Sequence, residues 1–143
     1  GLILIGTGAK LTVDLDYISE LTNVPDSVNG WVDSQKGFFS GVEPDLYQLL
    51  VQRAAQIGPD VGLNDLLCCD KFDVLSEINR INLPTQIIAG NMDQLTPVRF
   101  ADYLAANIQN SVEYVVQGGD HFLQLQHHKE VNDRIEKFVQ RLK

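Results

Sequence analysis

The sequence predicts an α/β fold in which helices flank a parallel sheet, with a helical insertion after the first strand. Three short runs of apolar and β-branched residues, at 2–5, 85–90 and 112–116, have the length and composition of strands. Helical patterns separate the second run from the third and follow the third. Strands that alternate with helices in this way form parallel sheets. The long stretch between the first two runs has helical spacing, so we expect it to be a separate insertion.

Composition and charge exclude several classes of protein. The 143 residues carry 11 Lys and Arg against 19 Asp and Glu, a formal net charge of -8. Nucleic acids and anionic membranes attract surfaces rich in Lys and Arg, so this balance argues against both as partners. No apolar run approaches the ~20 residues of a membrane span. The adjacent Cys68 and Cys69 lack the spacing of a disulfide framework or a metal site, so we expect reduced thiols, no metal, no cofactor and a cytoplasmic location.

The first element is a strand over residues 2–5, with the sequence L-I-L-I. Four consecutive apolar residues, two of them β-branched, indicate a strand buried on both faces. A buried strand is an unusual start for a chain, and we therefore expect further sequence before it. Gly6 and Gly8 follow as a turn. An interpretation as a dinucleotide-binding loop fails because Leu11 stands where the third glycine of that motif belongs.

Residues 11–70 are expected to form a helical insertion rich in loops. Near its start, leucine and isoleucine recur at three-residue spacing, which favours a short helix. Three glycines interrupt residues 26–41, a stretch that also carries Trp31, Phe38 and Phe39, and no particular element is predicted there. A helix with Pro44 in its first turn follows and ends at Gly58-Pro59, and another short helix is predicted over 64–69.

Residues 71–143 are expected to form the α/β core together with residues 1–10. The predicted elements, in order, are a short helical approach at 73–80, a strand at 85–90, a helix from 97 to 108, a strand at 112–116 and a final helix at 128–142. Thr96 is expected to cap the first long helix, with Pro97 at the first helical position. Three strands make a thin parallel sheet, so we expect this sheet to be the end of a larger one.

Chemistry is expected at the carboxyl ends of the second and third strands, where Asp93 and His121 follow in loops. A carboxylate beside an imidazole fixes its tautomer and stabilises the imidazolium that forms when it accepts a proton. The alternative is an Asp that caps a helix and a His that only packs. A metal site that also uses Asp120, His127 and His128 is disfavoured, because adjacent histidines point apart on a helix and lack the i, i+4 spacing.

The loops resemble those of the α/β-hydrolase family. Residues 90–97 read G-N-M-D-Q-L-T-P, which is similar to the family's acid loop G-x-x-D-x-x-x-P. Residues 115–122 read V-V-Q-G-G-D-H-F and resemble its histidine loop G-x-G-H-F, with Asp120 in place of a small residue. Residues 81–85 resemble the I-x-x-P-T that leads into the acid strand. Residues 2–8 resemble the strand after the nucleophile helix, and the insertion matches only as a cap.

The resemblance implies a serine-type hydrolase in which Asp93 is the acid and His121 the base of a Ser-Asp-His triad. In that family the chain order is nucleophile, acid, histidine, with the nucleophile on a G-x-S-x-G elbow. No such motif occurs here, and Ser40 lies in G-F-F-S-G, which has the wrong glycine spacing. We therefore expect the C-terminal half of a hydrolase that cleaves an ester or similar acyl bond of a small apolar substrate. Ser, Asp and Cys remain open as its nucleophile.

Five apolar side chains are candidates for substrate contact: Trp31, Phe38, Phe39, Leu95 and Phe122. The three aromatic residues of the insertion equally fit its own core, and a residue placed like Leu95 is more often a packing residue than a substrate contact. The expected partners are a small apolar ester-like substrate and the missing N-terminal half of the same protein. The alternative is a catalytically inactive fragment or interaction module that forms a homodimer through its exposed sheet.

Overall fold

The computed structural model describes residues 1–23, 28–39 and 41–142, and these form two compact units. The first unit comprises Gly1–Lys10 and Asp73–Lys143, and the second comprises Leu11–Phe72. The regular elements of the first unit are β1 (Leu2–Ile5), the 3-10 helix η2 (Ile78–Arg80), β2 (Thr85–Gly90), α4 (Val98–Asn107), β3 (Ser111–Val116), α5 (Leu123–Gln126) and α6 (His128–Arg141). Those of the second unit are α1 (Leu15–Asn23), α2 (Val28–Lys36), the 3-10 helix η1 (Gly37–Phe39) and α3 (Pro44–Lys71).

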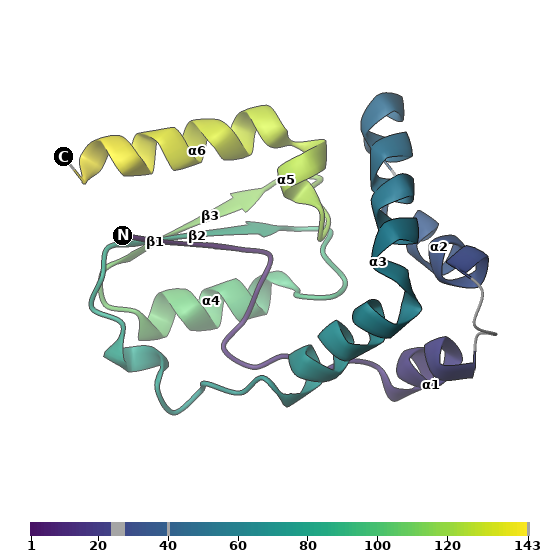
Figure 1. Ribbon diagram of the computed structural model, residues 1–143. Coiled ribbons are helices and arrows are strands. Elements are labelled where there is room, and N and C mark those ends of the chain that lie inside the picture. Colours follow the sequence, from purple (N-terminus) through teal and green to yellow (C-terminus); the bar gives the residue numbers. More distant parts are fainter. Residues whose placement is uncertain (24–27, 40, 143) are drawn as a thin grey trace. The chain divides into compact units, whose positions relative to one another are not determined.

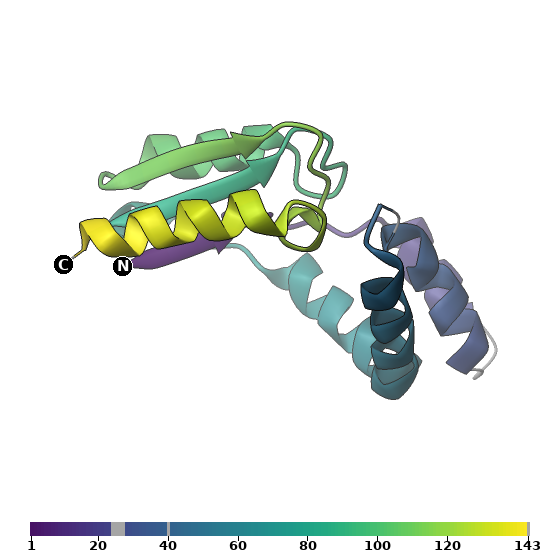
Figure 2. The same ribbon diagram turned by 90° about the horizontal axis from the view of Figure 1, so that it is seen from above.

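The predicted parallel sheet is confirmed. Its three strands lie in the order β1-β2-β3, and both pairs run parallel. All six residues of β2 are buried, as expected for the central strand of a sheet covered on both faces. Helix α4 covers one face and α6 covers the other (Figure 1, Figure 2). The carboxyl ends of β2 and β3 therefore meet at one edge of the sheet.

The core of the first unit has two halves because successive residues of β2 face opposite sides. On the α4 side, Ile87 and Ala89 pack with Leu104 and Ile108. On the α6 side, Ile88 packs with Val116, Leu123 and Val131, the last from α6. Such burial is the main favourable contribution to folding, at about 25 cal/mol per Å² of apolar surface removed from water.

The chain leaves the first unit after Lys10 and returns to it at Asp73, and these two residues lie side by side. Lys10 and Asp73 form an isolated antiparallel bridge, and their side chains form an ion pair of 2.9 Å. The backbone N–H of Val74 also donates to the carbonyl of Ala9 at 2.8 Å. Because the two crossing points are held together, the insertion between them needs no change in the strands on either side.

Helix α2 lies in the glycine-interrupted stretch 26–41, for which the sequence predicted no particular element. Trp31 and Val32 are buried, and Trp31 Nε1 donates to the carbonyl of Ala54 in α3 at 2.8 Å. The Trp31 ring lies directly against Gly62, where only a residue without Cβ fits. Packing of this aromatic side chain therefore outweighs the low helix propensity of Gly30, a difference of about 1 kcal/mol.

Other boundaries differ for local reasons. Gly58 interrupts α3 with φ 77, as predicted for the end of a helix, but the second segment resumes directly at Pro59 and not near residue 64. A proline suits this position because the N–H that it lacks is unpaired in the first turn of a helix. Helix α5 is an additional element that the sequence pattern did not predict. Ser40 lies outside the described residues. Across the described ranges, no helix is both long and apolar enough to cross a membrane.

Candidate active site

The loops that follow β2 and β3 are in direct backbone contact. Gly90 ends β2, and a Cβ there would lie 2.2 Å from the carbonyl oxygen of Gly119 in the histidine loop. That is far inside van der Waals contact, so only glycine allows this approach. One hydrogen bond joins the same two loops, from the N–H of Met92 to the carbonyl of Gly119 at 2.9 Å. The glycine therefore sets the distance between the two segments that carry Asp93 and His121.

Asn91 ties the loops together a second time. Its backbone N–H donates to the carbonyl of Val116 at 3.1 Å. Its side-chain amide donates to Gln117 Oε1 at 2.9 Å and accepts the N–H of Gly118 at 2.7 Å. Gly118 has φ +78, a conformation that L side chains rarely adopt, and it turns the chain back toward Asn91. The acid loop and the histidine loop therefore form one hydrogen-bonded unit.

Asp93 lies at the centre of this unit and is buried, with 3% of its surface exposed. Oδ1 of its carboxylate accepts the backbone N–H groups of Leu95 and Thr96, each at 2.8 Å. Oδ2 accepts the hydroxyl of Thr96 at 2.7 Å and lies 3.0 Å from Nδ1 of His121. Both carboxylate oxygens are therefore paired, as a buried charge requires.

The environment of Asp93 favours its charged form. Burial alone raises the pKa of this carboxyl, but hydrogen bonds from His121 and from the backbone and hydroxyl of Thr96 outweigh it. The resulting pKa of Asp93 is about 2, below its ordinary value of 3.8. Asp93 is therefore ionised at neutral pH, as needed to stabilise a positive charge on the adjacent imidazole.

The ring of His121 joins the buried carboxylate to a more open surface. Its Nδ1 faces Asp93, yet 31% of the side chain is exposed, against 0% for the Asp93 side chain. Nε2 makes no hydrogen bond to any residue in the described part of the chain. Gly6, which directly follows β1, has φ +53, and a Cβ there would lie 3.7 Å from Nδ1 of His121. A base held at one nitrogen and accessible at the other can take a proton from a third group.

Asp120 stands where the family's histidine loop has a small residue, and its side chain connects this loop to α5 by a hydrogen bond. Oδ1 accepts the N–H of Phe122 at 2.8 Å, and Oδ2 accepts the amide of Gln126 at 2.6 Å. The amide oxygen of Gln126 accepts the N–H of Asp120 at 3.4 Å in return. The Asp120 carboxylate and the Gln126 amide together therefore hold the backbone on both sides of His121.

Thr96 has a different role from the predicted one. Pro97 occupies the N-cap position of α4, and no side chain caps that end of the helix. The Thr96 hydroxyl instead bonds to Asp93 and lies 3.3 Å from Nδ1 of His121. The sequence also did not indicate the role of Asn91 in joining the two loops. The only indication of the contact between Thr96 and Asp93 in the sequence was that Thr96 lies three residues after Asp93, and a residue that caps the following helix would lie at the same position.

The structure locates the five candidate substrate-contacting residues in two separate groups. Trp31 and Phe39 are buried within the second unit, with 6% and 8% exposed, and Phe38 there is half-buried and packs edge-on against Tyr17. In the first unit, Leu95 is 50% exposed beside Asp93, and the Phe122 ring lies edge-on to His121 at 5.5 Å. Contact of any of these side chains with substrate stays a prediction.

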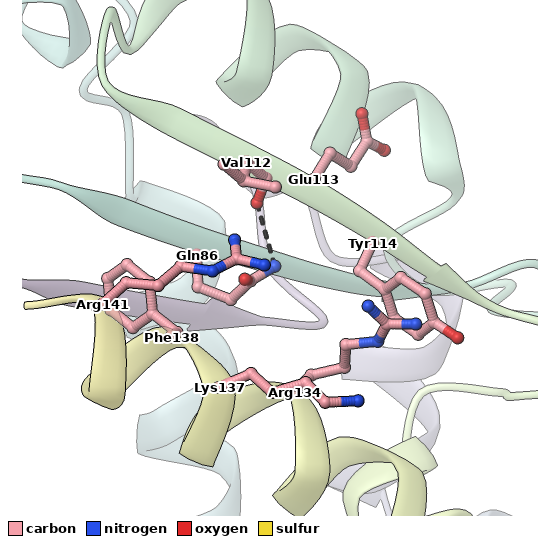
Figure 3. Close-up of a pocket in the computed structure, with 8 residues that line it drawn as sticks. All are labelled: Gln86, Val112, Glu113, Tyr114, Arg134, Lys137, Phe138 and Arg141. Carbon is pink, nitrogen blue, oxygen red and sulfur yellow. Dashed lines mark hydrogen bonds between the residues drawn. The ribbon is translucent and has the colours of Figure 1, made fainter.

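A small hollow lies elsewhere in the first unit, between α6 and the amino-terminal half of the sheet (Figure 3). Its volume is about 70 Å³, and its lining includes Gln86, Tyr114 and Arg134. The Arg134 guanidinium lies over the Tyr114 ring at 3.7 Å, a cation–π contact that fills one wall. Gln86 and Val112 in the lining are the second residues of β2 and β3, so the hollow lies away from the strand ends that carry Asp93 and His121.

The residues that the structure describes contain no group of three or more His, Cys, Asp or Glu side chains arranged to hold a metal ion. Cys68 and Cys69 are free.

Solved structures resemble this chain over nearly its whole length. A thermophilic esterase matches 98% of it at 30% identity with a TM-score of 0.80, and a bromoperoxidase from Bacillus anthracis matches 96% at 23% identity with a TM-score of 0.81. A peroxisomal α/β-hydrolase from Saccharomyces cerevisiae matches 99% at 16% identity with a TM-score of 0.68. The chain has the α/β-hydrolase fold. No family model and no curated protein matches it.

The chain covers only part of the length of each of these α/β-hydrolase structures. The chain spans 56% of the esterase, 57% of the bromoperoxidase and 46% of the peroxisomal α/β-hydrolase. It therefore corresponds to about half of an α/β-hydrolase, the C-terminal part that carries the acid and histidine loops.

Proposed function

We propose that Asp93 and His121 are the acid and the base of a triad that hydrolyses an ester or similar acyl bond of a small apolar substrate. The observation that carries this proposal is the 3.0 Å contact between Asp93 Oδ2 and His121 Nδ1, in which the carboxylate is buried and the imidazole is partly exposed. The likeness to a thermophilic esterase at 30% identity supports the ester class.

In the proposed reaction His121 transfers one proton in each of two half-reactions. Its Nε2 takes the proton from the nucleophile as the nucleophile attacks the acyl carbon, and gives it to the leaving alkoxide as the acyl–oxygen bond breaks. Water then repeats the sequence and releases the acid. The ionised Asp93 stabilises the imidazolium in both halves of the reaction. Loss of either group typically costs several powers of ten in turnover.

The nucleophile of this proposal lies outside the 143 residues. The family resemblance assigns it to a G-x-S-x-G elbow, a motif that the sequence does not contain. The partial coverage of the esterase structure is consistent with a nucleophile on the portion that this chain does not match. We assign to Leu11–Phe72 the role of a cap that excludes water from the bound substrate.

A second candidate function rests on the edge of the sheet. β1 is an edge strand made only of Leu and Ile residues, each partly exposed. Exposed apolar edge strands pair readily with other chains. In this case the chain is an inactive interaction module that forms a homodimer.

Intact mass spectrometry with a fluorophosphonate probe separates the two candidates. The protein that carries this chain is purified and measured before and after exposure to the probe, which labels activated serines. A covalent adduct that is lost in the His121→Ala variant supports the triad. A single species of 15.9 kDa that takes no label and elutes as a dimer supports the interaction module and contradicts the triad.

A further inference from the structure

The hydroxyl of Thr96 lies beside the contact between the two proposed catalytic groups. Its Oγ1 lies 2.7 Å from Oδ2 of Asp93 and 3.3 Å from Nδ1 of His121. The Thr96 residue is buried, with 7% of its surface exposed. Its backbone N–H also bonds to Asp93, at Oδ1. The backbone N–H and the side-chain hydroxyl of Thr96 therefore both donate to the carboxylate of Asp93.

Counting protons in this cluster determines the direction of each hydrogen bond. The ionised carboxylate of Asp93 is acceptor-only, so the shorter contact requires the Thr96 hydroxyl to donate its single proton to Oδ2. The same hydroxyl can then only accept from His121. Nδ1 of His121 therefore faces two acceptors, Oδ2 at 3.0 Å and Oγ1 at 3.3 Å, and must carry a proton itself.

The opposite tautomer leaves a buried conflict. With its proton on Nε2, His121 would present an Nδ1 lone pair to the carboxylate at 3.0 Å. The single hydroxyl proton could then satisfy Oδ2 or Nδ1, but not both. An unsatisfied buried polar group costs about 1–3 kcal/mol, which corresponds to roughly a 5- to 150-fold bias against that tautomer.

We propose that Thr96 is a positioning residue that holds His121 in the tautomer with its proton on Nδ1, leaving Nε2 free as the base. The tautomer itself follows from the geometry, whereas its use in catalysis rests on the proposed function. Thr96 acts by fixing the carboxylate oxygen and by adding a second acceptor for the Nδ1 proton. A role as helix cap does not account for these contacts, because Pro97 occupies the N-cap position.

The test is nitrogen-15 NMR of the histidine rings in the protein that carries this chain, recorded in mildly alkaline buffer. We expect the wild-type spectrum to show a proton on Nδ1 and none on Nε2 of His121. Thr96→Val should shift the two nitrogen resonances toward each other and speed exchange of the Nδ1 proton with water about 3- to 10-fold, as expected for the loss of one hydrogen bond. Thr96→Ser should restore wild-type values, because it keeps the hydroxyl.

Thr85→Val is the matched control. Thr85 is also buried, in β2 of the same unit, but its hydroxyl donates to the carbonyl of Leu83 at 2.9 Å. That variant should leave the His121 resonances unchanged. If Thr96→Val does not fold, Thr96→Ala removes the hydroxyl without adding volume and gives the same readout.

Two results would overturn the proposal. One is a wild-type His121 with its proton on Nε2, and the other is a hydroxyl-free variant whose tautomer and exchange rate equal those of the wild type. Failure of the proposed function looks different: the Nδ1 tautomer and its dependence on Thr96 would persist in a protein that hydrolyses no ester. In an active protein, Thr96→Val should lower kcat with KM unchanged within about twofold, because Thr96 acts through His121.

Discussion

Replacing Asp93 by Asn should make the stability of the protein less dependent on pH. The carboxylate accepts four hydrogen bonds, and its pKa is about 2 in the folded state against 3.8 ordinarily. A folded-state pKa below the unfolded one means that the unfolded chain binds more protons as pH falls. The stabilising contribution of Asp93 is therefore complete above about pH 5 and is lost progressively as pH falls toward 2.

The size of this contribution follows from the pKa shift. Each pKa unit corresponds to about 1.4 kcal/mol, so the shift from 3.8 to about 2 gives about 2 kcal/mol above pH 5. At pH 3 about half of this contribution remains. Asn adds a penalty of about 1–3 kcal/mol that does not depend on pH, because its amide hydrogens face donors from Thr96 and His121.

Urea unfolding followed by circular dichroism at pH 6 and at pH 3 measures both the pH-dependent contribution and the pH-independent penalty. We expect Asp93→Asn to lower the free energy of unfolding by about 3–5 kcal/mol at pH 6, and by about 1 kcal/mol less at pH 3. Asp133→Asn is the control, since Asp133 forms an exposed ion pair with Lys137 and should cost under about 1 kcal/mol. A loss that is equal at both pH values would refute the assigned ionisation of Asp93.

Three further substitutions test other contacts. Gly90→Ala should destabilise the protein by about 1–3 kcal/mol in urea unfolding, because its Cβ would overlap the backbone of the histidine loop. Glu113→Gln should raise the urea midpoint at pH 7, since burial raises the pKa of this carboxyl; the gain should shrink as pH falls and Glu113 takes up a proton. Gly62→Ala should change the emission of Trp31 and lower the melting temperature, since the Cβ would lie 2.1 Å from its ring, whereas Gly37→Ala, in open space, should do neither.

The sheet and the pairing of Asp93 with His121 were predictable because both depend on short-range patterns. Strands 2–5 and 85–90 have the predicted bounds, and the third begins one residue early, at Ser111. Parallel strands place their carboxyl ends at one edge of the sheet, which made a contact between the two loops plausible. The resemblance of both loops to those of the α/β-hydrolase family made the pairing specific. The structure contains this contact, at 3.0 Å between Asp93 Oδ2 and His121 Nδ1.

The contacts that refine this pair were not predictable, because they depend on side-chain direction. Thr96 before Pro97 has the sequence of a helix cap, and only the fold shows its hydroxyl turned toward Asp93. The contact between Gly90 and the histidine loop joins residues far apart in sequence. Helix α2 was missed because its stability depends on Trp31 packing against α3, which local propensity does not report.

Ester hydrolysis by the His121→Ala variant of the protein that carries this chain tests the central claim most directly. The matched control is His128→Ala, since His128 is an exposed residue at the start of α6, outside the Asp93 cluster. The account predicts that His121→Ala lowers kcat for a short-chain ester at least about 1000-fold with an unchanged circular dichroism spectrum, while His128→Ala stays within about twofold of wild type. A His121→Ala variant that turns over the ester as the wild type does would contradict it.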